Sequence, residues 1–201
     1  MAMAKPWSGQ LSDAFSFMFA FYGLVLGLAL AEIAAGFSRA YDERNIRRIG
    51  VVAPLFGLLL LIDLITFWTN AWAYRDLSEV KFIAALGIAA VSLLYYFAST
   101  QVFPKATEKQ DLDDHIMQSR RVVVFCVIVA NLITQIPPLY LAIATQQSLI
   151  ETVVWAALNL TYYGLLSITA LTTSKRTVAI ALAATITFVV GATIIFSYFL
   201  G

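Results

Sequence analysis

Charged residues are scarce in this chain. Only 12% of its 201 residues are Asp, Glu, Lys or Arg, and 61% are hydrophobic, whereas soluble domains carry about 25% charged residues. The 13 basic and 12 acidic residues leave a net charge of +1, so no strong positive field attracts nucleic acid. The composition excludes an ordinary water-soluble domain and disfavours nucleic acid as a partner.

Residues that carry metal, redox and covalent chemistry are almost absent. His115 is the only histidine and Cys126 the only cysteine, so one subunit cannot build a disulfide, a bis-histidine haem site or a His-Glu-x-x-His protease site. No lysine falls within an apolar run, which excludes a retinal Schiff base. The chain also lacks a Thr-Val-Gly-Tyr-Gly filter and a glycine-rich phosphate loop. We therefore expect no cofactor, no metal site and no enzymatic activity.

Long apolar runs account for most of the chain. A helix of about 20 apolar residues crosses the hydrocarbon core of a bilayer, and six segments reach that length. The connections between them are too short to fold independently. We predict an all-α polytopic membrane bundle of six transmembrane helices, forming one domain over residues 1–201. The predicted spans are 14–37, 50–72, 82–103, 122–144, 151–172 and 177–200.

The basic residues predict an orientation for this bundle. Cytoplasmic loops carry an excess of Lys and Arg, and Trp and Tyr gather at membrane interfaces. Ten basic residues lie in connections one, three and five, against three on the opposite face, which predicts that both termini lie outside (N-out/C-out). The ten are Arg39, Arg44, Arg47, Arg48, Lys105, Lys109, Arg120, Arg121, Lys175 and Arg176, and the three are Lys5, Arg75 and Lys81. The aromatic residues expected at the outer ends are Trp7, Trp68, Trp72, Trp155, Tyr74, Tyr140 and Tyr198.

One carboxylate is predicted to lie deep in the membrane. Asp63 follows Arg48 by about 15 residues, or roughly 20 Å of helical rise, which is too deep for its short side chain to reach water. An ionisable group at mid-span costs at least about 2.5–3.5 kcal/mol, so Asp63 needs a partner or a cavity. Thr66 and Asn70 follow it on the same helical face. The second span is therefore expected to present a polar stripe.

Polar residues of the fourth and fifth spans are expected to meet this stripe. Pro137-Pro138 interrupts the fourth helix, and a broken helix beside polar side chains is typical of an ion or solute site. Alternatively, Asn131, Gln135 and Asn159 hydrogen-bond one another as structural contacts. The polar faces comprise Asn131, Thr134, Gln135 and Pro138 in the fourth span, and Asn159, Tyr162, Tyr163 and Ser167 in the fifth. A further stripe in the third span is compatible with either a lined pathway or ordinary packing of hydroxyls, and is interpreted first as packing. It comprises Ser92, Tyr95, Tyr96 and Ser99.

Two other groups of charged residues have simpler interpretations. Glu32 lies near the predicted cytosolic end of the first span, where it reaches the interface or pairs with Arg39 two helical turns later. Four residues in the third connection could attract a divalent ion, but a solvated acidic patch balanced by nearby basic residues is favoured. These four are Asp111, Asp113, Asp114 and His115, and the basic residues are Lys109, Arg120 and Arg121.

Small residues recur every four positions along two of the spans. Such residues let helix backbones approach closely within a membrane. They indicate either contacts within one subunit or the interface of a homo-oligomer. The stripes are Gly23, Gly27, Ala31 and Ala35 in the first span, and Ala183, Thr187 and Gly191 in the sixth.

Two stretches carry a resemblance to known proteins. They are Asp111-Leu-Asp-Asp-His-Ile-Met-Gln-Ser-Arg-Arg-Val-Val-Val and Asp13-Ala-Phe-Ser-Phe-Met-Phe-Ala-Phe-Tyr-Gly-Leu, which resemble a group of uncharacterised six-helix inner-membrane proteins of proteobacteria. The resemblance covers most of the chain and implies a bacterial inner-membrane location but no activity. Ala14-Phe-Ser16 is also similar to bacterial relatives of the lysosomal potassium channel, although this chain lacks their Phe-Ser-Asp motif and its predicted outward N-terminus contradicts their topology.

Two functions are compatible with these patterns. The first is a channel or carrier for a small ion or solute. The second is an accessory or scaffold subunit that binds another membrane protein or a lipid through its small-residue faces. The candidate transport and binding residues are Asp63, Thr66, Asn70, Asn131, Gln135, Asn159 and Glu32.

Overall fold

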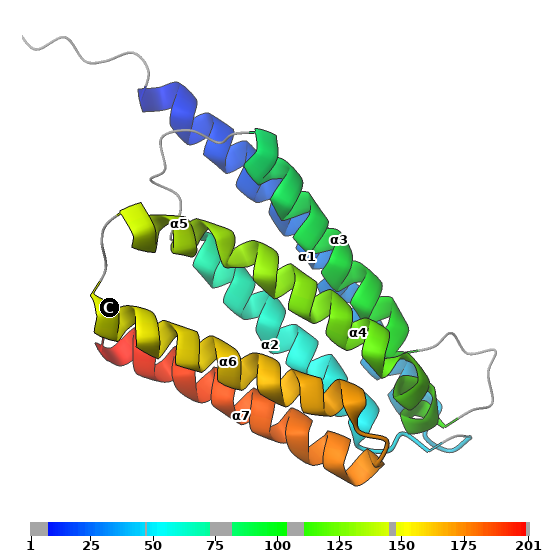
Figure 1. Ribbon diagram of the computed structural model, residues 1–201. Coiled ribbons are helices and arrows are strands. Elements are labelled where there is room, and N and C mark those ends of the chain that lie inside the picture. Colours follow the sequence, from blue (N-terminus) through cyan, green and yellow to red (C-terminus); the bar gives the residue numbers. More distant parts are fainter. Residues whose placement is uncertain (1–7, 47, 73–81, 104–110, 145–147, 200–201) are drawn as a thin grey trace, which may run out of the picture.

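The computed structural model describes residues 8–46, 48–72, 82–103, 111–144 and 148–199, and the side chains of 19–46, 48–70, 85–103, 111–140 and 148–195. Within these ranges all regular structure is helical (Figure 1). Six helical segments are long and apolar enough to cross a membrane, which confirms the predicted all-α, six-span, multi-pass membrane fold. The helices are α1 (Ser8–Asp42), α2 (Val52–Trp72), α3 (Phe82–Val102), α4 (Leu112–Thr134), α5 (Ile136–Ala144), α6 (Leu149–Leu171) and α7 (Lys175–Phe199).

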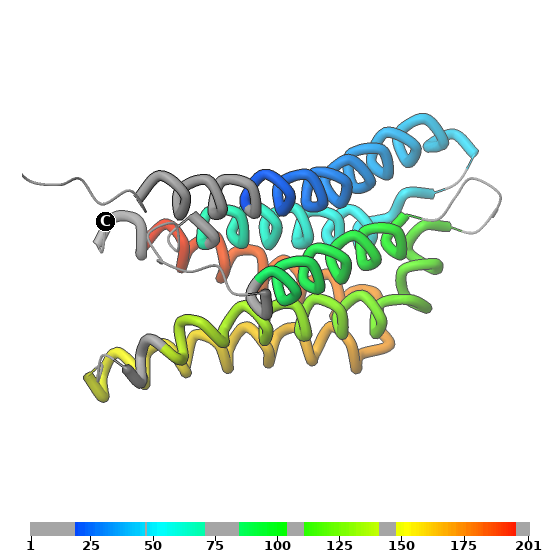
Figure 2. Tube along the Cα trace, turned by 90° about the horizontal axis from the view of Figure 1, so that it is seen from above, coloured from blue at the N-terminus to red at the C-terminus, as the bar shows by residue number. Residues whose placement is uncertain are grey.

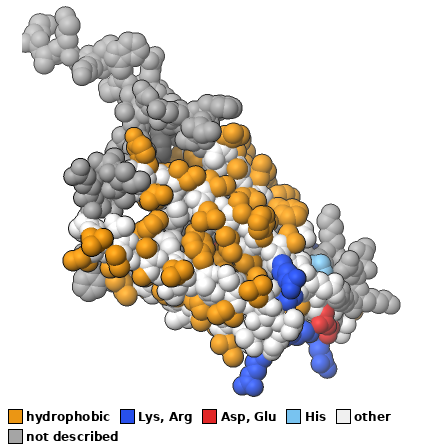
Figure 3. Space-filling model, viewed as in Figure 1, with side chains coloured by type: hydrophobic (Ala, Val, Ile, Leu, Met, Phe, Trp, Pro, Cys, Tyr) orange, Lys and Arg blue, Asp and Glu red, His pale blue; other side chains and the backbone are white. Residues whose placement is uncertain are grey.

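The helices run along a common direction and define two ends of the bundle. α3 packs against α1 and α4, and α7 packs against α6 and α2. The start of α1 and the finish of α7 lie at the same end (Figures 1 and 2), which we call the terminal end. At the opposite, basic end lie the described basic side chains, as Figure 3 shows beside an apolar flank. They are Arg39, Arg44, Arg48, Arg120, Arg121, Lys175 and Arg176.

The clustering of basic residues at one end fits the pattern used to orient the bundle, and the assignment of that end to the cytosol stays a prediction. Of the aromatic residues expected at the outer face, Trp68, Tyr140 and Trp155 have described side chains. Trp68 and Tyr140 are exposed, as interfacial rings tend to be. Outside the residues with described side chains lie Trp7, Trp72, Tyr74 and Tyr198, and the basic residues Lys5, Arg47, Arg75, Lys81, Lys105 and Lys109.

The fourth span begins earlier than predicted, at Leu112 rather than at residue 122. The hydropathy pattern did not assign residues 112–121 to the span, because charged side chains interrupt the apolar run there. Leu112 and Ile116 are nonetheless fully buried one helical turn apart. The helix therefore extends out of the predicted span and packs into the bundle.

Asp113, on this extension, caps the start of α2. Its carboxylate accepts hydrogen bonds from the backbone N–H groups of Val51 (3.0 Å), Val52 (2.9 Å) and Ala53 (3.0 Å). These groups have no partner within the helix. Gly50 precedes them with φ of +70°, and a Cβ at that position would overlap the Asp113 carboxylate. Asp113 is therefore a structural cap rather than part of the solvated patch that the sequence suggested.

The fourth span is interrupted where the sequence predicted. α4 ends at Thr134, the N–H of Gln135 donates to the carbonyl oxygens of Asn131 (3.1 Å) and Leu132 (3.2 Å), and α5 starts at Ile136. The two prolines that follow have no N–H to continue the helical ladder. Gln135 itself keeps right-handed helical backbone angles (φ −80°, ψ −12°), so it lies one helical turn beyond Asn131, toward the terminal end.

Candidate functional site

Asp63 is buried within α2, with 5% of its surface exposed. Donors from three other helices converge on one carboxylate oxygen, Oδ2. The Tyr162 hydroxyl of α6 donates at 2.8 Å, the Tyr95 hydroxyl of α3 at 3.3 Å and the Asn131 amide of α4 at 3.5 Å. We call these four residues the Asp63 cluster. Four helices thus meet at a single acid.

Helical periodicity brings these polar side chains together. Each lies on the buried face of its helix, at a spacing of three or four residues from apolar core positions. Asp63 follows Leu59 and Leu60, and Asn131 follows Val127. The cluster therefore interrupts an apolar core that its own helices build.

Asn131 organises the cluster. Its Nδ2 donates to the Val127 carbonyl at 3.0 Å, one turn earlier on α4. This bond orients the side-chain amide so that its nitrogen, rather than its oxygen, lies on the side of the cluster. The same nitrogen lies 3.2 Å from the Tyr95 hydroxyl and 3.3 Å from the Tyr162 hydroxyl. Nδ2 carries two hydrogens, so beyond the bond to Val127 it has one hydrogen for the two hydroxyls and Asp63 Oδ2, while each hydroxyl donates its own hydrogen to Asp63. The donors of the cluster therefore point toward the carboxylate.

No cation neutralises Asp63 among the residues whose side chains are described. The ion pairs of that part of the chain join Arg39 to Glu32 at 2.8 Å and Lys175 to Asp114 at 2.5 Å. Neutral donors stabilise an ionised carboxylate but do not cancel its charge, and an uncompensated charge inside a membrane protein is costly. The described side chains therefore leave the charge of an ionised Asp63 without a compensating positive charge.

Polar side chains continue from the cluster toward the terminal end. The Gln135 amide donates to Asn159 Oδ1 at 2.8 Å, and Asn159 Nδ2 donates to the Trp155 carbonyl at 2.9 Å. The Tyr163 hydroxyl lies beside the Gln135 side chain, but it is buried without a hydrogen bond of ordinary geometry. This pair and the adjacent hydroxyl extend the polar region by about one helical turn.

Toward the basic end, α3 presents the buried hydroxyl of Ser99, which donates to the Tyr96 carbonyl of its own helix. The other three helices of the cluster and α7 present apolar side chains next to it. These side chains are at most 2% exposed. Their helical positions place them between Asp63 and the basic end. We call them the apolar layer, which comprises Phe56, Leu59 and Leu60 of α2, Val124 and Val127 of α4, Leu166 of α6 and Leu182 of α7.

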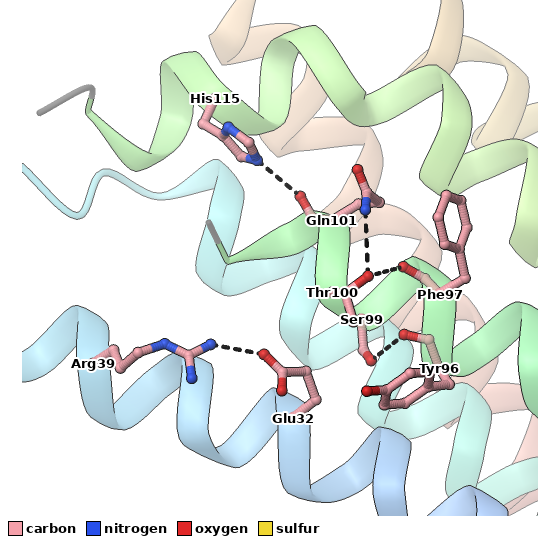
Figure 4. Close-up of polar contacts among 8 residues, drawn as sticks. All are labelled: Glu32, Arg39, Tyr96, Phe97, Ser99, Thr100, Gln101 and His115. Carbon is pink, nitrogen blue, oxygen red and sulfur yellow. Dashed lines mark hydrogen bonds and ion pairs between the residues drawn. The ribbon is translucent and has the colours of Figure 1, made fainter. Parts of the chain in front are cut away.

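The structure brings only some of the predicted site residues together. Asp63 and Asn131 share the cluster, and Gln135 and Asn159 form the adjoining pair. Thr66 is half-buried and Asn70 exposed, and no hydrogen bond joins either to Asp63. Glu32 accepts from Arg39, as the sequence suggested, and this pair lies on α1 beside the end of α3 (Figure 4).

Tyr95 belongs to the site, although the sequence had assigned it to a packing stripe. Its neighbours in that stripe behave as expected, because Ser92 donates to the Ile88 carbonyl (2.9 Å) and Ser99 to the Tyr96 carbonyl (2.7 Å; Figure 4). Of these described side chains, only that of Tyr95 makes a hydrogen bond to another helix. Tyr95 is buried in the structure, but the spacing of residues within one helix could not show that it lies against Asp63.

The small-residue stripe of α1 divides into a packed part and an open part. A Cβ on Gly23 would lie 2.6 Å from the Trp68 ring, whereas one on Gly27 would meet nothing within 4 Å. Ala31 is exposed and Ala35 half-buried. Beside Gly27, an apolar groove of about 230 Å³ opens between α1 and α2. Its lining residues are Gly23, Leu26, Gly27, Leu30, Leu64, Ile65 and Trp68.

Comparison of the chain with protein-family models, curated proteins and solved structures gave no match. The fold and the site define a multi-pass membrane protein with a buried acid held by neutral donors.

Proposed function

We propose that the protein is a channel or carrier for a small ion or solute in the bacterial inner membrane, with the Asp63 cluster as its binding centre. One observation supports this proposal above the others. Asp63 is buried among side chains from three other helices, and its described partners are neutral. Ionisable residues within membrane spans typically mark ion or substrate pathways.

A purely structural role would not require an acid at this position. The oxygen of an Asn side chain could accept from the same three donors without placing a charge in the membrane. Buried ionic groups add little stability compared with well-packed neutral residues. A structural role therefore does not explain why this position carries a carboxylate. Reversible binding of a positive charge does explain it.

The proposal assigns different roles to the other candidate residues. Asn131 orients the cluster, while Gln135 and Asn159 line the approach from the terminal end. Thr66, Asn70 and Glu32 make no hydrogen bond to Asp63 and receive no role in the binding centre.

Flux into liposomes tests the proposal. Purified protein is reconstituted and assayed with monovalent cations, protons and small neutral solutes, and wild type is compared with Asp63→Asn. Glu32→Gln is the matched control, because it makes the same change from acid to amide outside the cluster. We expect Asp63→Asn to reduce flux to the level of empty liposomes and Glu32→Gln to retain it. Equal flux in wild type and Asp63→Asn would remove Asp63 from the mechanism.

A second candidate function is an accessory or scaffold subunit. The open groove at Gly27 favours it, because small residues that face no neighbour within the subunit can receive another helix. Its test is purification in mild detergent followed by measurement of the mass of the complex for wild type and Gly27→Leu. A larger assembly that Gly27→Leu dissociates supports this function. A wild-type monomer that conducts flux counts against it.

A further inference from the structure

The two oxygens of the Asp63 carboxylate have different surroundings. All three donors of the cluster contact Oδ2, at 2.8, 3.3 and 3.5 Å. The other oxygen, Oδ1, accepts no hydrogen bond from any residue whose side chain the structure describes. One oxygen thus holds the carboxylate in place, and the other is left without a donor.

This asymmetry suits an acid that gains and loses a proton. When a carboxylic acid is protonated on one oxygen, the other remains a hydrogen-bond acceptor. A proton on Oδ1 therefore leaves the bonds from Tyr162, Tyr95 and Asn131 to Oδ2 in place. Both protonation states are compatible with the same side-chain arrangement.

We propose that Asp63 is a proton-binding site, that the proton is received at Oδ1, and that H⁺ is the ion moved by the transport proposed above, on which this inference rests. The step is an addition of H⁺ to the carboxylate to form the neutral acid. No other bond forms or breaks, and no further reactant is required.

The chemistry of the cluster favours a proton over a metal cation. A bound Na⁺ or K⁺ needs several oxygen atoms to replace its hydration shell. Here Asn131 presents its amide nitrogen, a donor that repels a cation, and both tyrosine hydroxyls direct their hydrogens to the carboxylate. A proton needs only the one oxygen that the cluster leaves available.

The surroundings also indicate the side from which the proton arrives. Two buried hydroxyls near the cluster, those of Tyr22 on α1 and Tyr163 on α6, have no hydrogen-bond partner. The Phe67 ring lies between Tyr22 and Tyr95, with its centroid 4.9 Å from the first ring and 6.2 Å from the second. Buried hydroxyls without a protein partner are places where ordered water binds. Water at these hydroxyls would supply protons to the terminal side of the cluster.

On the basic side the apolar layer lies next to the cluster, and the buried Ser99 hydroxyl one turn beyond Tyr95 donates to the Tyr96 carbonyl of its own helix. No hydrogen-bonded chain of described side chains therefore leads from Asp63 toward the basic end. The titratable groups near Asp63 are Tyr95 of α3 and Tyr162 of α6, which donate to it, and Tyr163, whose ring packs against that of Tyr162. Tyr22 of α1 is separated from Tyr95 by the Phe67 ring. Among the described residues, neither α4 nor α7 brings a charged group to Asp63. Protons therefore enter from the terminal end, and release toward the basic end requires the layer to separate.

Infrared difference spectroscopy of the purified protein tests the proton site directly. Acidification of wild type should produce a carbonyl-stretch band of a protonated carboxyl group, and Asp63→Asn should lack this band. Glu32→Gln should keep it. Tyr162→Phe should move the band to higher frequency, because Oδ2, the carbonyl oxygen of the protonated acid, loses its shortest hydrogen bond. If Asp63→Asn does not fold, Tyr162→Phe serves as the test in its place. A band unchanged in Asp63→Asn or in Tyr162→Phe overturns the inference.

Proton flux into liposomes, driven by a potassium diffusion potential and followed with an enclosed pH dye, separates this inference from the proposed function. Loss of both the band and the proton flux in Asp63→Asn supports both proposals. Flux of another species that depends on Asp63, without the band, overturns the proton site and leaves the transport function standing. The band without flux of any species overturns the transport function, and with it proton transport, but leaves proton binding.

Discussion

Asp63 and Asp113 each accept three hydrogen bonds, yet the two sites are built differently. The donors to Asp113 are consecutive backbone N–H groups at the start of α2, and they occupy both of its oxygens. The donors to Asp63 are side chains of three other helices, and all of them contact one oxygen. Asp113 lies at the basic end, whereas Asp63 lies within the membrane-spanning part of α2.

The difference shows what each negative charge does. At Asp113 the charge faces the positive end of the α2 dipole and satisfies amides that have no other partner, so the acid stabilises the fold. At Asp63 no helix N-terminus and no described cation faces the charge. An acid whose charge the fold does not use is available for chemistry.

The largest expected effect comes from exchanging acid for amide at both positions. Asp63→Asn should abolish flux with little change in thermal stability, because the Asn oxygen can accept the same three hydrogen bonds. Asp113→Asn should do the reverse, keeping flux and losing about 1–3 kcal/mol of stability, because the amide offers one oxygen to N–H groups that use both oxygens of Asp113 and so leaves a donor unsatisfied. Liposome flux and thermal unfolding in mild detergent, measured on both variants, check this. If both variants lost flux and thermal stability to the same extent, the two acids would not differ in role.

Gly50→Ala should give the next largest effect. Its φ of +70° disfavours any residue with a Cβ, and that atom would overlap the Asp113 carboxylate. Backbone strain of this kind costs about 1–3 kcal/mol. Thermal unfolding measures the loss. Gly50→Ala combined with Asp113→Ala should lose less than the sum of the two single variants, and full additivity would show that the overlap is unimportant.

The sequence predicted the fold better than it predicted the site. Six apolar runs of spanning length fixed the helices, because backbone groups in lipid must be satisfied within a helix. The same reasoning placed the start of α4 at residue 122, since charged residues such as Asp113 resemble a loop in hydropathy. Only the tertiary contact with α2 shows that these residues form a packed helix.

The site was predicted in part for a related reason. Depth in the membrane singled out Asp63, and helical faces related Asn131 to it. Thr66 and Asn70 share a helical face with Asp63 by spacing, but the packing of α2 leaves Asn70 exposed. Tyr95 was missed because a tyrosine in an apolar span fits packing equally well. Which faces meet depends on how the helices pack, and spacing within one helix does not contain that information.

A pair of adjacent tyrosines should give a smaller but sharper effect. Tyr162→Phe removes the 2.8 Å bond to Asp63 and should lose about 0.5–1.5 kcal/mol of stability. Tyr163→Phe removes a hydroxyl that is buried without a partner, so it should cost no stability. Thermal unfolding of the two variants checks this. A larger loss in Tyr163→Phe would mean that its hydroxyl is firmly bonded to water or ligand and belongs to the centre.

The smallest effect is expected where the chain leaves open space. In Gly27→Ala the new methyl group meets nothing within 4 Å, and Ala is favoured over Gly in a helix by up to about 1 kcal/mol, so a monomer should keep or gain stability. In Gly23→Ala the methyl group would lie 2.6 Å from the Trp68 ring and should destabilise the contact between α1 and α2. Thermal unfolding in mild detergent compares them. If Gly27→Ala is the more destabilising change, another chain or a lipid fills the open part of the stripe in the membrane. That result would support the accessory or scaffold function independently of the Asp63 cluster.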